Sequence, residues 1–458
     1  MSDNTMDGGP YPGDDPRPVW DLERYKTQPG QMIDPPRRLE DKRLVTGEYT
    51  SDGLDLFWKA FWGVFLSVFT AGIYRFWMTT KLRRHYWGGI QVLGDPLEYT
   101  GRGLEKLLGF LFAMVILAVY LGFVNLGLTF VGFSLASDDE NVAQLAVNLS
   151  ILSTLPLIFF AQYRGMRYMM SRTRWRGIRF GMGPGSWGYT FRAILLSALT
   201  LVTLGLAYPF QHYTLAKYMT DRCWFGDQRF EQRGSWWELM AAWIWVYVML
   251  FFMGLSIWAI SGTAGKGDTF GIIIGVVIYL GSFIALYVVS LRYRYHAFKA
   301  LWSGKRLGDV SFESQLGIGD AVSVLISAWF ITSLSFSLVI GVFGTLFTVA
   351  FAYFGLDTEA FGAGLDFANE EDIFGMLADL LTSPIVLSGI FTTYLLAIMV
   401  VFAVSQVFFT HRILRRKVDT MVIHNSRALK ESRQRSHDKA AEAGGFADAL
   451  GVDVGAGF

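Results

Sequence analysis

The chain has 458 residues, of which 52% are hydrophobic, 16% aromatic and only 17% charged, and its mean hydropathy is +0.34. Average soluble domains carry about 25% charged residues, so this composition excludes an ordinary soluble enzyme and indicates a polytopic membrane protein. The net charge of +1 gives no overall basic field for nucleic acid. One cysteine, Cys223, excludes an internal disulfide and a multi-thiolate metal site.

The first 50 residues are polar and hold seven of the twelve prolines. Such a segment cannot bury a core, so residues 1–50 are predicted to be a disordered, proline-rich cytoplasmic arm. It lacks the apolar core of a signal peptide. Residues 425–458 alternate charge with alanine and glycine and predict a mobile cytoplasmic tail. The membrane domain is therefore assigned to residues 51–424.

Six apolar runs reach the roughly 20 residues that a helix needs to cross the hydrocarbon core. They are 107–134, 142–163, 238–261, 269–291, 321–356 and 380–409. Two further apolar stretches, 54–80 and 187–218, are interrupted near the middle, the first by Gly72 and the second by Gly205 with Pro209.

Basic clusters indicate how these two stretches are arranged, because lysine and arginine concentrate on the cytoplasmic side of a membrane protein. The clusters are 81–84, 164–179, 217–222, 292–306 and 412–417. The candidate external loops hold one lysine and many acids, and they are 137–140, 262–268 and 356–379. All clusters fall on one side if each interrupted stretch enters and returns on the same face. We therefore expect about six crossings, two re-entrant or interfacial helical hairpins and both termini in the cytoplasm; eight plain spans are the alternative.

The stretches 56–120 and 189–253 look like two copies of one unit. The repeat units are placed at about 52–180 and 185–305, followed by a third helix pair at 319–424. A Gly-Asp pair, which favours a turn before a short strand, recurs three times. These structural turns are Gly94-Asp95, Gly226-Asp227 and Gly308-Asp309. With alternating segments at 175–180 and 418–423, five strands could form a small cytoplasmic sheet. The fold class predicted is an all-α polytopic membrane protein with an internal pseudo-repeat and short cytoplasmic β-strands.

The run Thr70-Ala71-Gly72-Ile73-Tyr74-Arg75-Phe76-Trp77 is followed by a basic segment, by Gly94-Asp95 and by Leu97-Glu98-Tyr99-Thr100-Gly101. This pattern resembles the YjgN-like family of bacterial inner-membrane proteins, over about residues 50–425. In the second unit Gln211 and His212 are aligned with Tyr74 and Arg75. The family is a domain of unknown function, so the resemblance implies a location in the bacterial inner membrane and no mechanism.

Charge enters the apolar region at the two hairpins, whereas the interiors of the six runs hold no charged residue or histidine. A proton relay or ion-coupled site built from the six runs is therefore not expected. Broken helices at membrane depth can line a solute path. The solute-path candidates are Lys59, Gly72, Tyr74, Arg75, Arg192, Gly205, Pro209 and His212. The alternative is that Lys59 and Arg192 reach lipid headgroups while the hairpins lie in the interface.

No enzyme motif stands out: the six histidines lack metal-ligand spacing, and the glycine-rich segment 181–185 lacks the Lys-Ser/Thr of a phosphate loop. We predict no catalytic residue, no metal and no cofactor. The basic clusters are interleaved with aromatic residues directly after membrane helices, which favours anionic lipid over nucleic acid as the partner. The lipid-headgroup candidates are Arg83, Arg84, Arg164, Arg167, Arg292, Arg294 and Arg412.

Two functions are compatible with this pattern. The first is a transporter- or channel-like protein for a small uncharged or anionic solute, in which Arg75 and His212 converge on a polar cavity. The second is a non-catalytic membrane scaffold or accessory subunit that binds anionic lipid and, through the N-terminal arm, a partner complex. A membrane enzyme is the third possibility.

Overall fold

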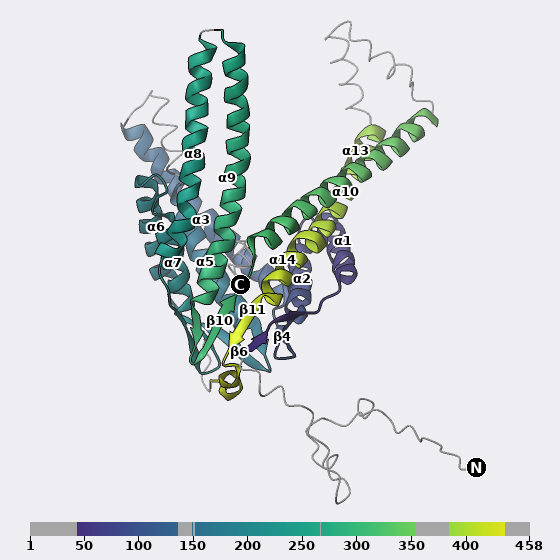
Figure 1. Ribbon diagram of the computed structural model, residues 1–458. Helices are drawn as coiled ribbons and strands as arrows, with labels where there is room; N and C mark the ends of the chain where they lie inside the picture. Colours follow the sequence, from purple (N-terminus) through teal and green to yellow (C-terminus); the bar gives the residue numbers. More distant parts are fainter. Residues whose placement is uncertain (1–43, 136–148, 150–151, 266, 354–383, 436–458) are drawn as a thin grey trace, which may run out of the picture. The chain divides into compact units, whose positions relative to one another are not determined.

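The computed structural model describes residues 44–135, 149, 152–265, 267–353 and 384–435. Residues 1–43 of the predicted arm, residues 436–458 of the predicted tail, and the predicted external loops 137–140 and 356–379 lie outside them. The described chain is mostly helical and adds one antiparallel sheet of short strands (Figure 1).

Five segments of the described chain are helices long and apolar enough to cross a membrane. The first four lie in α3 (Gly103–Leu135), α8 (Trp237–Ala264), α9 (Thr269–Ser303) and α10 (Ile318–Tyr353). The fifth combines α13 (Pro384–Ser405), the π-helical turn η3 (Gln406–His411) and α14 (Arg412–Asp419) without a break. Their side chains are mostly exposed apolar groups, as lipid contact requires.

Five of the six apolar runs predicted to cross are therefore helices that could span a membrane. The remaining run, 142–163, lies partly outside the described residues, and α5 (Leu155–Arg172), which overlaps its end, is not one of the five apolar helices.

The two interrupted stretches fold as helical hairpins. Helices α1 (Gly53–Phe69) and α2 (Arg75–Gly89) pack against each other, as do α6 (Ser186–Val202) and α7 (Tyr208–Thr220). Each helix is shorter than the roughly 20 residues needed to span the hydrocarbon core. Each interrupted stretch is therefore two shorter helices and not one continuous helix.

The described strands form one sheet in which every pair of neighbours is antiparallel. The strands are β1 (Leu44–Thr46), β2 (Glu48–Tyr49), β3 (Ile90–Val92), β4 (Asp95–Tyr99), β5 (Thr173–Trp175), β6 (Ile178–Met182), β7 (Cys223–Phe225), β8 (Gln228–Gln232), β9 (Lys305–Leu307), β10 (Val310–Ser314) and β11 (Met421–His424). From β2 to β11 the spatial order follows the chain. Strand β2 pairs with β3 and β1 pairs with β11, and only Gly47 separates β1 from β2. The extended segment 44–49 therefore connects both ends of the sheet, which curves like a barrel.

Two-residue turns join the strands in pairs, and their backbone conformation explains the glycines. Leu93 and Gly94 have φ values of 55° and 84° between β3 and β4, as a type I′ turn requires. Gly226 and Gly308 have φ values of 56° and 55° at the first turn position of their hairpins. Glycine accepts positive φ without strain, so these turns fix the strand registers.

The inner face of the sheet holds a hydrophobic core to which strands far apart in the sequence contribute. Trp175, Phe225, Leu307 and Ile423 are almost fully buried in it. Leu429, from the 3-10 helix η4 (Ser426–Glu431), is buried among them. The sheet core thus includes residues that the sequence pattern assigned to the tail.

The same order of elements occurs twice: a helical hairpin, a β-hairpin, two helices and a second β-hairpin. Helices α1 and α6 begin at Gly53 and Ser186, 133 residues apart, and α2 and α7 begin at the same spacing. Strands β3 and β7 keep this spacing, which aligns Gly94 with Asp227. The recurring pairs Gly94-Asp95 and Gly226-Asp227 are therefore one residue out of register with each other.

The prediction of an all-α fold is corrected by the sheet, which has eleven strands where five were expected. The predicted strands are found at β4, β8, β10, β11 and the β5–β6 region. Strands β3, β7 and β9 have three residues each, and so short a segment does not show a recognisable alternating pattern.

Candidate functional site

The turns of the two helical hairpins have the same geometry. Ala71 and Gly72 have φ values of 48° and 88°, and Leu204 and Gly205 have 51° and 94°. The Gly72 N–H donates to Ser67 O at 2.6 Å, and the Gly205 N–H donates to Thr200 O at 2.6 Å. This is the Schellman arrangement that ends a helix. The predicted break in each apolar stretch is therefore a Schellman-type helix end, and it occurs in both units.

The solute-path candidates of the first hairpin separate into two groups. Lys59, on α1, binds Asp55 and lies 3.5 Å from His85 Nδ1. At the turn, the Tyr74 hydroxyl accepts a hydrogen bond from Lys81 Nζ at 2.6 Å, and Arg75 is exposed as the first residue of α2.

The solute-path candidates of the second hairpin contact the helices of that hairpin and α9. Arg192 donates to Gly188 O at 2.9 Å and lies over the Tyr218 ring, and Pro209 is buried in the first turn of α7. His212 Nδ1 is 3.1 Å from the hydroxyl of Tyr293 on α9. Among the described residues, no side-chain contact joins Arg75 to His212, so their convergence on a polar cavity stays a prediction. The 133-residue spacing aligns Arg75 with Tyr208, which corrects the alignment of Arg75 with His212.

Aromatic donors that sequence reasoning missed bind the second turn. Trp243 Nε1, on α8, donates to Gly205 O at 3.1 Å, and the Tyr247 hydroxyl donates to Leu204 O at 2.7 Å. The Trp243 and Tyr293 ring centroids are 4.8 Å apart. The spacing of Trp243 and Tyr247, one helical turn apart, was the available signal.

A network of polar side chains connects the loop after β2 to both helices of the first hairpin. The Ser51 hydroxyl is 2.6 Å from His85 Nε2, and His85 Nδ1 is 3.2 Å from Asp55 Oδ2. Burial, with the nearby charge of Lys59, lowers the pKa of His85, and the hydrogen bond from Lys59 lowers the pKa of Asp55. A neutral imidazole can donate to Asp55 and accept from Ser51.

The order Ser51–His85–Asp55 matches that of a nucleophilic triad. Asp55 is also paired with Lys59, however, and this cation offsets the charge that would stabilise an imidazolium. We therefore interpret the network as a connection that holds α1 and α2 to the sheet.

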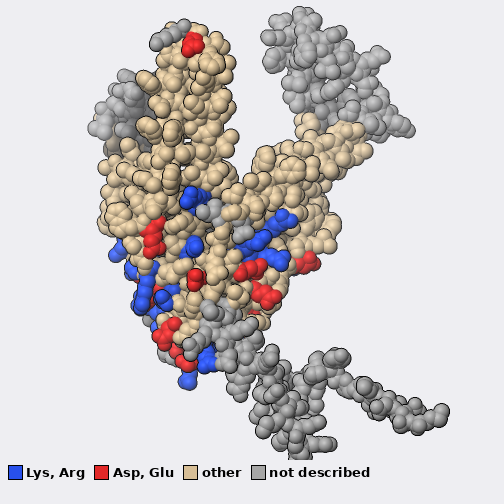
Figure 2. All heavy atoms as spheres, viewed as in Figure 1, with Lys and Arg blue, Asp and Glu red and all other residues tan. Residues whose placement is uncertain are grey.

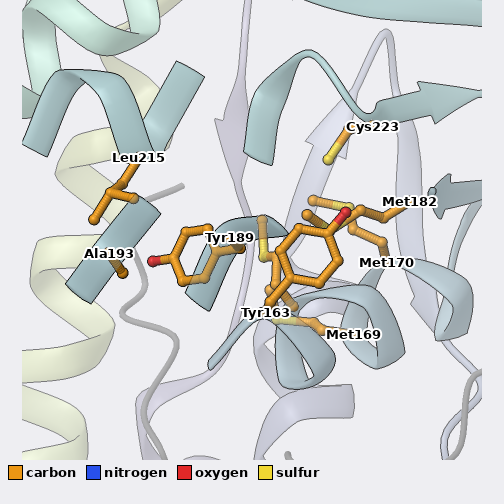
Figure 3. Close-up of a cluster of buried hydrophobic side chains, with 9 residues drawn as sticks. Tyr163, Met169, Met170, Met182, Tyr189, Ala193, Leu215 and Cys223 are labelled. Atoms are coloured by element: carbon orange, nitrogen blue, oxygen red, sulfur yellow. The ribbon is translucent and has the colours of Figure 1, made fainter. Parts of the chain in front are cut away.

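A second buried cluster lies where α5, α6 and α7 meet β6 and β7 (Figure 3). The Tyr163 hydroxyl donates to Gly183 O at 2.7 Å, and the Tyr189 hydroxyl donates to Gln162 Oε1 at 2.9 Å. Burial raises the pKa of the Cys223 thiol, in the same cluster, to about 12. A thiol protonated at neutral pH is a poor nucleophile, so Cys223 belongs to the packing of this cluster.

The acids of the predicted Gly-Asp turns have structural partners. Asp95 binds Arg176 across the β4–β5 pair. Asp227 Oδ1 accepts from the Arg433 N–H at 3.0 Å, and Asp309 O accepts from Asn425 Nδ2 at 3.5 Å. In the part of the chain that the structure describes, no group of three His, Cys, Asp or Glu residues could hold a metal ion.

The predicted headgroup arginines fall into three groups. Arg83 donates to the Tyr99 hydroxyl at 3.3 Å and Arg84 donates to Gly101 O at 2.9 Å, so both bind within the protein. Arg164 and Arg167 are half-buried on α5. The three exposed members are Arg292, Arg294 and Arg412.

Arg412 lines a cavity of about 500 Å³ between the start of α10 and α14. Arg415 and Arg416 contribute two more guanidinium groups from α14, and Ser323 and Ser327 contribute hydroxyls from α10. Arg415 and Arg416 were missed individually, although they lie in the basic cluster 412–417. With three guanidinium groups in its lining, this cavity can hold an anionic group.

One of the comparisons with known proteins identifies a family. Residues 45–449 match the family described as bacterial protein of unknown function, DUF898. Neither the curated proteins nor the solved structures contain a match. The family match covers most of the chain and confirms the resemblance to the YjgN-like family. The chain belongs to the DUF898 family of bacterial proteins, and the part that the structure describes holds five candidate membrane-spanning helices.

Proposed function

We propose that this protein is a non-catalytic scaffold of the bacterial inner membrane that holds its sheet against anionic lipid headgroups on the cytoplasmic side. The supporting observation is the placement of basic residues on the helices that lead into the sheet. Helices α2, α5, α7, α9 and α14 are each followed by a strand, namely β3, β5, β7, β9 and β11. Each carries lysine or arginine near that end.

Figure 2 supports this placement on the face in view, where lysine and arginine side chains gather around the strands and the adjoining helix ends. The long parts of α8 and α9 are largely free of charged side chains in the same view. Each basic group near an anionic leaflet contributes about 1 kcal/mol of attraction. A ring of such groups around the sheet would fix its depth and its side of the membrane.

The sidedness is tested by labelling single cysteines in intact cells with an impermeant maleimide, in a Cys223→Ala background. Asp309→Cys, in the β9–β10 turn, is expected to stay unlabelled, and Asp366→Cys is expected to react. Labelling of Asp309→Cys but not of Asp366→Cys would reverse the proposed topology.

A solute path through the hairpins is the second candidate, because both hairpins repeat the same Schellman turn at matching positions. Transporters use such broken helices to bind solutes. Proteoliposomes distinguish the two functions. A scaffold shows no solute flux above protein-free vesicles, and deletion of residues 1–42 removes a co-purifying partner. Saturable flux that Arg75→Ala or His212→Ala abolishes would establish transport instead.

A further inference from the structure

The cavity between α10 and α14 has a side-chain set suited to one kind of ligand. Arg412, Arg415 and Arg416 lie at positions i, i+3 and i+4 of one helix, so their side chains share a face. Ser323 and Ser327 lie one turn apart on α10 and face them across the cavity. Guanidinium groups bind phosphate oxygens through paired N–H donors, and hydroxyls add further donors.

The charge of the cavity remains positive after its own acid is counted. Asp419 is the one carboxylate among the lining residues whose side chains the structure describes. Its Oδ1 accepts from the Tyr49 N–H at 3.0 Å, and its Oδ2 lies 3.4 Å from Arg415 Nε. Arg412 Nη1 lies 3.5 Å from Ser327 Oγ, a long contact that a stronger acceptor can replace.

The cavity lies at the end of two candidate spans, Val322–Leu346 and Leu387–Asp419. In the same part of α10, the apolar residues Ile326, Trp329 and Phe330 are 64%, 72% and 60% exposed. A headgroup phosphate in the cavity would place acyl chains along these apolar groups. The π-helical turn η3 immediately precedes Arg412, and such turns are frequent at functional sites.

We propose that this cavity binds a phosphate group, as carried by an anionic phospholipid headgroup or by free phosphate. The inference deepens the proposed scaffold function by naming the ligand chemistry of one site. The apolar surface of α10 beside the cavity favours the lipid as the source.

The test uses the purified full-length protein in an uncharged detergent and follows thermal unfolding by tryptophan fluorescence. Short-chain phosphatidylglycerol, the corresponding diacylglycerol and inorganic phosphate are titrated separately. The variants are Arg412→Gln alone and Arg412→Gln with Arg415→Gln. The matched control is Arg229→Gln with Arg233→Gln, two exposed arginines in and directly after β8 that are not among the headgroup candidates.

Phosphatidylglycerol is expected to raise the unfolding temperature saturably, whereas diacylglycerol does not. The double cavity variant should weaken the apparent affinity at least tenfold, the single variant should weaken it less, and the control should keep it. Equal stabilisation by inorganic phosphate would support the phosphate site and assign it to a free anion. Equal phosphatidylglycerol binding by all variants, or an equal loss in the control, would overturn the proposal. Solute flux in proteoliposomes would refute the scaffold function without refuting the phosphate site, because flux does not change the measured affinities for phosphatidylglycerol.

Discussion

Gly304, between α9 and β9, offers a direct test of how tightly the sheet is packed against the helices. Its φ of −81° suits any residue, so glycine is needed here for space and not for conformation. A Cβ atom at this position would collide with the backbone oxygen of Arg233 and lie 2.6 Å from Gln232 Nε2. Backbone atoms cannot rotate away, so Gly304→Ala must push the end of β8 outward.

The displacement affects two hydrogen bonds. The Arg233 N–H donates to Gly304 O at 2.7 Å, and Gln232 Nε2 donates to Leu301 O at 2.9 Å. Overpacking costs about 1–3 kcal/mol, and each weakened hydrogen bond adds about 1 kcal/mol. We therefore expect Gly304→Ala to lower the free energy of unfolding by about 2–4 kcal/mol.

Gly88→Ala is the matched control, because Gly88 is exposed on α2 and a Cβ atom there meets nothing within 4 Å. Alanine favours a helix interior over glycine by up to about 1 kcal/mol, so this variant should be slightly more stable than the parent. Equilibrium unfolding in mixed detergent micelles, followed by tryptophan fluorescence, measures both. A Gly304→Ala protein as stable as the parent would refute the packing argument.

Three further predictions concern single residues. Cys223 should resist iodoacetamide at pH 8 in the folded protein and react after denaturation, because burial raises the pKa of its thiol to about 12; rapid native labelling would contradict this. Burial lowers the pKa of His85, so the unfolded chain binds the proton more readily than the folded chain does. The stability that this group contributes is therefore present above about pH 6.5 and is lost as the pH falls below that value. His85→Gln should therefore flatten the pH dependence of the unfolding temperature between about pH 6.5 and 5; an unchanged slope would count against it. Gly72→Ala should lower the free energy of unfolding by about 1–2 kcal/mol through its φ of +88° alone. Gly205→Ala should lower it more, because its Cβ atom would lie 3.0 Å from the Tyr247 hydroxyl oxygen. The same unfolding assay ranks the two variants, and equal losses would contradict the added contact.

The long helices were predictable because their apolar runs exceed the length of any strand. The helix breaks were predictable as well, since Gly72 and Gly205 interrupt apolar stretches and supply the positive φ that ends a helix. The sheet was largely hidden, because its three-residue strands carry too few side chains to show a pattern. Pairing between strands such as β1 and β11, at opposite ends of the described chain, leaves no local signal.

The candidate sites were predictable only in part. Charge within apolar stretches identified Lys59 and His212, but their partners Asp55 and Tyr293 become evident only when the helices pack. The basic cluster 412–417 marked the position of the arginine cavity. The serines of α10 that complete it depend on tertiary packing, since they lie far from that cluster in the sequence.

The segment 44–49 has a consequence for the order in which the protein is assembled. It pairs with β3 at one end of the sheet and with β11 at the other, so its second partner is synthesised only after the five candidate spans of the described chain. Until then β1 has no strand beside it, and unpaired strand edges are sites of aggregation and proteolysis. Chains truncated before Met421 would keep that edge open. The unpaired edge of β1 is therefore covered only once β11 has been synthesised.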